Sequence, residues 1–158
     1  MHYKDLVRYF KDKPQEQTLG AIRNAVLEVR ASKSMVLDAS DPNTKSAGSF
    51  FTNPILTKAE ASTLKAKAGE EVPLYPYGDA YKTSAAWLIE HSGFHKSFKL
   101  GNAALSSKHT LALINPGNAT AHDLIVLAQT IQKKVEETWG ISLVPEPQFW
   151  GFEKHPLI

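Results

Sequence analysis

The 158-residue sequence contains no cysteine. That absence excludes disulfide bridges, iron–sulfur clusters, cysteine-based zinc sites and a cysteine nucleophile. The sequence also lacks an excess of charge of one sign, because 18 Lys and Arg residues stand against 16 Asp and Glu residues. This balance gives no electrostatic reason to expect a nucleic acid or an anionic membrane surface as a partner.

Long hydrophobic runs are missing too. The longest, 111–114 and 124–128, are far below the ~18 residues that a membrane-spanning helix needs. The first five residues, Met-His-Tyr-Lys-Asp, contain no apolar signal region. We therefore expect a cytoplasmic protein with no membrane partner. Its 42% hydrophobic and 22% charged residues are ordinary for a globular domain, and its length favours a single one.

Several sequence signatures of nucleotide and metal sites are also absent. There is no Gly-x-Gly-x-x-Gly, no phosphate-binding loop ending in Gly-Lys-Ser or Gly-Lys-Thr, and no His-Glu-x-x-His. His91 and His95 are four residues apart, but Gly93 between them should end the helix that would align them. We interpret both as solvated loop histidines and expect no metal site.

Helical spacing of apolar residues, together with capping residues, predicts five helices. Thr18 precedes one apolar stripe, while Thr57 with Glu60 and Thr120 with Asp123 form capping boxes. Stop signals come from Pro14 and from glycines after the later helices. The predicted ranges are 3–14, 18–31, 57–69, 84–90 and 120–140.

Short strands are expected between these helices. The candidates are 49–51, ended by Pro54, then 103–114 as two strands or one bent strand, 141–144 and 148–152. Turn chemistry predicts loops over 32–48 and 72–81. Because strands and helices do not alternate regularly, we predict an α+β fold with a small mixed or antiparallel sheet packed with helices.

Three segments carry more chemistry than folding requires: 48–54, 145–147 and 106–110. In 48–54, the Ser49 hydroxyl and the Asn53 amide flank two phenylalanines; the structural alternative is a tight turn before core residues. The prolines on both sides of Glu146 remove two ladder donors and hold one carboxylate rigidly. The alternative there is an interrupted edge strand with Glu146 in solvent.

Basic groups mark two further positions. Lys108 and His109 lie at the start of a predicted strand, where they serve either a site or a polar strand flank. Lys33 follows a predicted helix and could equally interact with the negative end of its dipole.

Five stretches occur in an order that is similar to a known family: 48–54, 84–89, 107–115, 119–124 and 143–151. Together they resemble the C-terminal part of the UDP-N-acetylenolpyruvoylglucosamine reductases of peptidoglycan synthesis. The resemblance extends from about Tyr3 to Phe152, nearly the whole chain. The serine segment and the Pro-Glu segment at this separation are its most specific features.

The resemblance implies a reaction. In that family an N-terminal domain holds FAD, NADPH reduces the flavin, and UDP-N-acetylglucosamine enolpyruvate becomes UDP-N-acetylmuramate. By the resemblance, Ser49 is the general acid that protonates the substrate carbon next to its carboxylate. Glu146 matches the glutamate that helps to stabilise the intermediate.

Substrate contacts are implied in the same way. Lys33 and Asn53 match positions that bind the nucleotide-diphosphate part of the substrate, and His109 matches a nearby contact. Tyr75, Tyr77 and Lys82 lie in a predicted loop that could cover the nucleotide.

One departure from the family is large: the FAD domain and its active-site arginine are absent from these 158 residues. We therefore expect a substrate-binding domain that binds no cofactor and is inactive by itself. The expected division is 1–47 as helices and a loop that join the FAD domain, 48–152 as the substrate domain and 153–158 as a tail. The alternatives are a stand-alone UDP-sugar-binding module without catalysis and an interaction domain without a ligand.

Overall fold

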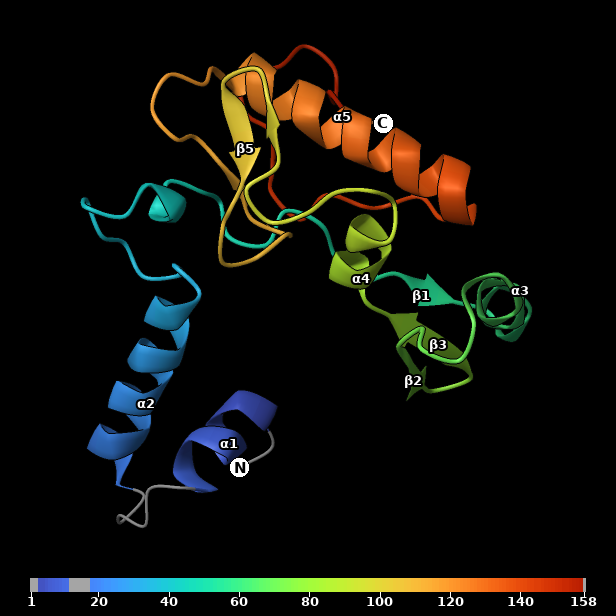
Figure 1. The fold of residues 1–158 in the computed structure, drawn as a ribbon, viewed down its shortest axis with the longest axis horizontal. Helices are drawn as coiled ribbons and strands as arrows, with labels where there is room; N and C mark the ends of the chain where they lie inside the picture. The colour runs from blue at the N-terminus through green and yellow to red at the C-terminus, as the bar shows by residue number, and fades with distance from the viewer. Residues whose placement is uncertain (1–2, 12–17, 158) are drawn as a thin grey trace.

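The computed structural model describes residues 3–11 and 18–157, so Pro14, the predicted end of the first helix, lies outside the described residues. Figure 1 shows two helices on one side, a long helix along another and two small sheets. The helices are α1 (Lys4–Lys11), α2 (Leu19–Ser32), the 3₁₀ turn η1 (Pro42–Thr44), α3 (Lys58–Ala68), α4 (Ala85–Glu90) and α5 (Ala121–Trp139). The strands are β1 (Ile55–Leu56), β2 (Leu74–Tyr77), β3 (Ala80–Thr83), β4 (Lys99–Leu100), β5 (Ala103–Leu105) and β6 (Leu113–Ile114).

Local capping sets the helix starts, as the sequence predicts. The Thr18 hydroxyl oxygen accepts a hydrogen bond from the Ala21 amide, and both predicted capping boxes, at Thr57 and Thr120, are formed. After α5, Gly140 adopts the left-handed conformation with φ 69°, which suits a residue without a side chain. None of the described helices is long and apolar enough to cross a bilayer.

Both sheets are antiparallel. The first has the strand order β1-β3-β2 and the second β4-β5-β6. In the second sheet the strands β5 and β6 are almost fully buried and pack against α5, whose apolar stripe includes Leu127, Ile131 and Val135. This arrangement confirms the predicted α+β class.

The prediction of a loop over 72–81 is wrong. Residues 74–83 form a hairpin, in which the Gly78-Asp79 pair connects β2 to β3 and Gly78 has a φ of 56°. A two-residue turn that begins with glycine matches the twist of the flanking strands. Pro76 is tolerated because β2 is an edge strand.

The predicted strands at 49–51, 141–144 and 148–152 are also wrong. Between these segments the structure has one isolated bridge, which joins Phe51 to Pro145. The nearest strand to the serine segment is β1, which begins directly after Pro54, whereas the prediction had a strand end at Pro54. The physical reason is the proline pair: Pro145 and Pro147 have no amide hydrogen, so a continuous ladder cannot form.

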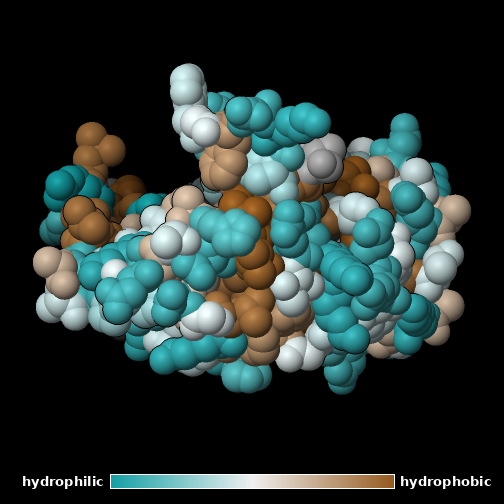
Figure 2. Space-filling view, turned by 90° about the horizontal axis from the view of Figure 1, so that it is seen from above, coloured by the Kyte–Doolittle hydropathy of each residue, from teal (hydrophilic) through white to brown (hydrophobic). Residues whose placement is uncertain are grey.

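One core joins these parts. It contains Phe50, Phe51, Leu88 and Ile89 together with residues of α5 and β5. Helices α1 and α2 pack on each other to one side of this core (Figure 1). Seen from above that view, most of the face is hydrophilic and apolar side chains gather in a central strip (Figure 2).

Candidate functional site

Four predicted site residues line one surface hollow. Ser49, Asn53, Lys82 and Glu146 come from three separate segments and surround a volume of about 390 Å³. The other lining residues are Phe51, Thr52 and Leu111. The structure therefore brings the hydroxyl, the amide, the ammonium and the carboxylate of the sequence prediction together.

Backbone hydrogen bonds fix the serine segment against the Pro-Glu-Pro segment. The Thr52 amide donates to the Val144 carbonyl at 2.9 Å, and the Glu146 amide donates to the Phe50 carbonyl at 2.9 Å. On its other side the Phe50 amide donates to the Leu111 carbonyl at 2.7 Å. Ser49 and Glu146 are thus carried by directly paired backbone, with Phe51, only 1% exposed, beneath them.

Asn53 has a structural partner that the sequence did not indicate. Its Oδ1 accepts a hydrogen bond from the Ala85 amide at 2.9 Å, at the first residue of α4. The Ser84 hydroxyl oxygen accepts from the Trp87 amide at 3.2 Å, so two side chains satisfy the start of this helix. The Asn53 side chain therefore ties the hollow to α4.

Lys82 belongs to an exposed face of the hairpin sheet that carries aromatic rings. In the ladder Lys82 lies opposite Tyr75 on one side and opposite Ile55 on the other. The Lys82 Nζ is 5.3 Å from the centroid of the Tyr77 ring. Tyr75 and Tyr77 are each about half exposed. Aromatic faces beside an ammonium group suit a ligand that combines a flat ring with phosphate groups.

Lys4 of α1 is a residue of this face that the sequence analysis missed. Its Nζ is 5.2 Å from the centroid of the Tyr75 ring. No signal in the sequence could have found it, because residues 4 and 75 meet only in the folded chain.

Lys33 is not in the Ser49 hollow. It lines a different hollow of about 330 Å³ between α1 and α2, where its Nζ donates to Asp5 at 2.6 Å. The hydrogen bond from Lys33 holds the pKa of Asp5 below its ordinary value. In this structure Lys33 is therefore one half of an ion pair between the two first helices.

His109 is linked to the Ser49 hollow through Leu111. Its Nδ1 accepts a hydrogen bond from the Leu111 amide at 3.0 Å, and Leu111 lines the Ser49 hollow. Burial lowers the pKa of His109 below 6.5, and the charges of Lys33 and Lys96 lower it further, while Glu90 acts in the opposite direction. His109 is thus a neutral imidazole near neutral pH, with its free nitrogen available as a donor.

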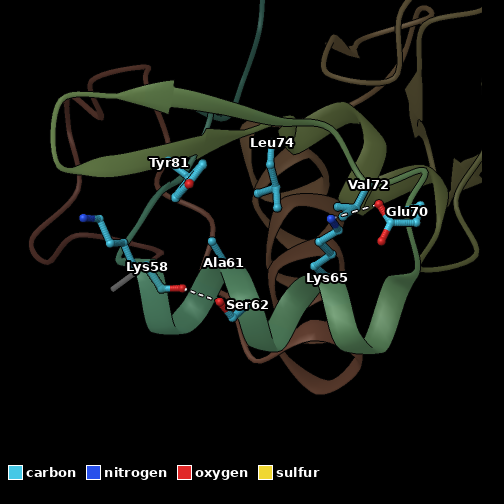
Figure 3. A pocket seen from close by; sticks show the side chains of 8 residues that line it. All are labelled: Lys58, Ala61, Ser62, Lys65, Glu70, Val72, Leu74 and Tyr81. Atoms are coloured by element: carbon cyan, nitrogen blue, oxygen red, sulfur yellow. Dashed lines mark hydrogen bonds and ion pairs between the residues drawn. The ribbon is translucent and has the colours of Figure 1, made fainter.

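A larger hollow of about 520 Å³ contains none of the predicted site residues. It lies between α3 and the hairpin, with Leu74 pointing into it from above and Lys65 paired with Glu70 at 2.9 Å (Figure 3). The Ser62 hydroxyl is satisfied by the Lys58 carbonyl of its own helix. In the described part of the chain, no three His, Cys, Asp or Glu side chains are grouped so that they could hold a metal ion.

Comparison with known proteins identifies what this chain is similar to. A family model described as the C-terminal domain of UDP-N-acetylenolpyruvoylglucosamine reductase matches residues 41–150. A protein of that name from Streptomyces avermitilis is 47% identical over 159 aligned positions, which cover 96% of this chain and 44% of the relative. Corresponding proteins are 46% identical in Thermobifida fusca and 52% identical, over 82% of this chain, in Corynebacterium glutamicum. The chain thus spans less than half the length of these relatives.

The Asn53 contact predicts a stability effect. Asn53→Ala should lower the free energy of unfolding by about 1 kcal/mol, because the Ala85 amide loses its acceptor. Asn53→Asp should stay near the parent value, since it keeps the oxygen and places a negative charge at a helix start. Urea unfolding followed by circular dichroism measures both, with Asn118→Ala at an exposed loop position as the control. Equal stability of Asn53→Ala and the control would contradict the capping role.

The environment of His109 predicts a pH effect. Because its pKa is lower in the folded than in the unfolded chain, the unfolded state binds more protons below pH 6.5. The free energy of unfolding should therefore fall as the pH decreases from 7.5 through 6.5 towards the lower folded pKa. His109→Asn, which keeps a local acceptor, should show a smaller decrease over this range in the same urea experiment. Parallel curves for the two proteins would refute the lowered pKa.

Proposed function

Because the chain belongs to the family of the C-terminal domain of UDP-N-acetylenolpyruvoylglucosamine reductase, we propose that it is the substrate-binding domain of such a reductase. The substrate is then UDP-N-acetylglucosamine enolpyruvate and the product UDP-N-acetylmuramate, in peptidoglycan synthesis. One observation carries this proposal: Ser49 and Glu146 line the same hollow on paired backbone segments.

In this proposal Ser49 gives the proton that completes the reduction. Flavin reduced by NADPH supplies the hydride, and the substrate is left with an enol-like negative charge that must accept one proton on a defined face. A serine hydroxyl is a weak acid, so it donates only when such a charge develops next to it. Glu146, held between two prolines, keeps its carboxyl group in a fixed place beside the reacting carbon and helps to stabilise the intermediate.

The nucleotide end of the substrate is assigned to the neighbouring basic and aromatic groups. Lys82 and the amide of Asn53 line the hollow. The exposed ring of Tyr75 lies beside Lys82, on the neighbouring strand of the sheet. Lys33 and His109 are assigned as further contacts to phosphate or carboxylate oxygens, on the resemblance. For Lys33, binding means exchanging the Asp5 carboxylate for a substrate anion.

Turnover requires a flavin portion in addition to these 158 residues. The chain spans 44% of the length of the Streptomyces avermitilis relative. The residues that the resemblance assigns to this chain serve the substrate, and none serves FAD or NADPH. We expect the chain by itself to bind no flavin and to turn over no substrate, with 1–47 facing the flavin portion, 48–152 binding the substrate and 153–158 as a tail.

Nucleotide binding by the isolated chain is the direct test. Titration of the ¹⁵N-labelled chain with UDP-N-acetylglucosamine enolpyruvate should give saturable amide shifts near Ser49, Asn53, Lys82 and His109. Titration with UMP is the matched control, and should shift the hairpin more than the Ser49 segment. A well-dispersed spectrum without shifts at saturating substrate would overturn substrate binding by this chain. Shifts confined to the hairpin would favour a UDP-sugar-binding module without catalysis.

The proton-donor role predicts a split between the two half-reactions. In an enzyme assembled from this chain and a flavin-bound N-terminal portion, Ser49→Ala should leave reduction of the flavin by NADPH unchanged. Oxidation of the reduced flavin by the substrate should slow by roughly 10²–10⁴-fold, because the general acid is lost. Stopped-flow absorbance of the flavin measures each step, with Ser62→Ala of the larger hollow as the control. Equal loss of both steps would exclude the role.

A further inference from the structure

The segment between Lys33 and Ser49 is a loop with a fixed internal structure. It lacks helix and strand apart from η1, yet Asp41 bonds two positions within it, Ser34 and Asn43, and Asn43 bonds Ser106 and Ser107, which are distant in sequence. We call this set of residues the loop hub. It consists of Ser34, Asp41, Asn43, Ser106 and Ser107.

Within the loop, the Asp41 carboxylate connects Ser34 to Asn43. Its carboxylate accepts a hydrogen bond from the Ser34 hydroxyl at 2.6 Å, and from the Asn43 amide at 2.9 Å and side chain at 2.7 Å. These bonds, with the Ser34 hydroxyl as the largest contribution, lower the pKa of Asp41. The carboxylate is therefore ionised at neutral pH, and its bonds are of the stronger, charge-assisted kind.

Asn43 connects the loop to the segment that carries His109. Its Oδ1 accepts from the Ser106 hydroxyl at 3.1 Å and from the Ser107 amide and hydroxyl at 2.8 and 3.2 Å. The Ser106 hydroxyl oxygen in turn accepts from the Lys108 amide at 3.1 Å. Because Ser106 is fully buried, loss of the Asn43 oxygen would leave a donor without water to replace it.

Ser34 connects the loop to Lys33. It is 4% exposed and has a φ of 56°, in the left-handed region that residues other than glycine seldom adopt. Such a conformation is energetically unfavourable and persists only where surrounding contacts hold it. The hydrogen bond to Asp41 is such a contact, and it fixes where the chain leaves α2 directly after Lys33.

We propose that Asp41 and Asn43 are positioning residues, which fix the end of α2, where Lys33 lies, relative to the segment that carries His109, so that two proposed substrate contacts keep their relative placement. Neither side chain touches the substrate; each acts through the segment it holds. The inference rests on the proposed function, since it assigns a purpose to the relative positions of two of its substrate contacts.

The first test needs no ligand. In Asn43→Ala, the ¹H–¹³C spectrum of His109 should report a pKa that moves up towards the ordinary histidine value. The reason is that the ring becomes less buried and the charge of Lys33 acts on it less strongly. The other charged groups that act on His109, Lys96 and Glu90, lie outside the hub and remain. Ser40→Ala is the matched control, since this exposed serine bonds only Asp38 within the same loop. An unchanged His109 titration in folded Asn43→Ala would overturn the proposal.

The second test uses binding. Asn43→Ala should weaken binding of UDP-N-acetylglucosamine enolpyruvate about 10-fold in isothermal titration calorimetry, the scale of one lost buried hydrogen bond. In a Lys33→Ala background the same change should have less than a 3-fold effect, because the group it positions is gone. Equal fold-changes in both backgrounds would indicate general destabilisation and refute positioning.

The outcomes separate this proposal from the function on which it rests. If the parent chain does not bind the nucleotide, substrate binding by the chain fails, and the His109 titration alone then decides whether the hub fixes the two segments. If Asn43→Ala does not fold, Asp41→Asn takes its place. That variant keeps one acceptor oxygen, replaces the other by an amide NH2 group and loses the charge, while the Asn43 bonds to Ser106 and Ser107 remain, so its change in the His109 pKa should have the same direction and a smaller size.

Discussion

Two backbone hydrogen bonds, between 50–52 and 144–146, are the constraint on which the site depends. They join the Thr52 amide to Val144 and the Glu146 amide to Phe50, and the two prolines beside Glu146 leave no amide there for a third. Because backbone pairing sets where side chains point, this short contact places the Ser49 hydroxyl and the Glu146 carboxylate in one hollow. The buried Phe51 beneath it prevents the segments from sliding.

The features that sequence reasoning predicted correctly are those encoded locally. A capping box needs two residues three positions apart, so Thr57 with Glu60 and Thr120 with Asp123 could be found without the fold. The same holds for the apolar stripe of α5 and for the left-handed end at Gly140. The grouping of Ser49 with Glu146 was a different kind of prediction: it came from a family resemblance, and no spacing in the sequence indicates it.

The features that were missed depend on contacts between distant residues. The prolines of 72–81 argued for a loop, and only the strand order β1-β3-β2, in which β2 pairs with β3 alone, explains why Pro76 is acceptable at a sheet edge. The Asn53 amide looked like a ligand group, but the start of α4 lies within its reach. Lys33 was expected to contact the nucleotide-diphosphate part of the substrate, and its pairing with the Asp5 carboxylate of α1 could not be read from the sequence. Each outcome is decided by a partner at least 28 positions away or by a neighbouring strand.

The two prolines also protect the surface of the molecule. Val144 is 60% exposed, and an exposed extended segment with free amides is a template on which another chain can add a strand. Since Pro145 and Pro147 have no amide hydrogen to offer, an incoming strand finds no regular row of donors there. The residues that immobilise Glu146 therefore also make the open side of the hollow a poor surface for edge-to-edge aggregation.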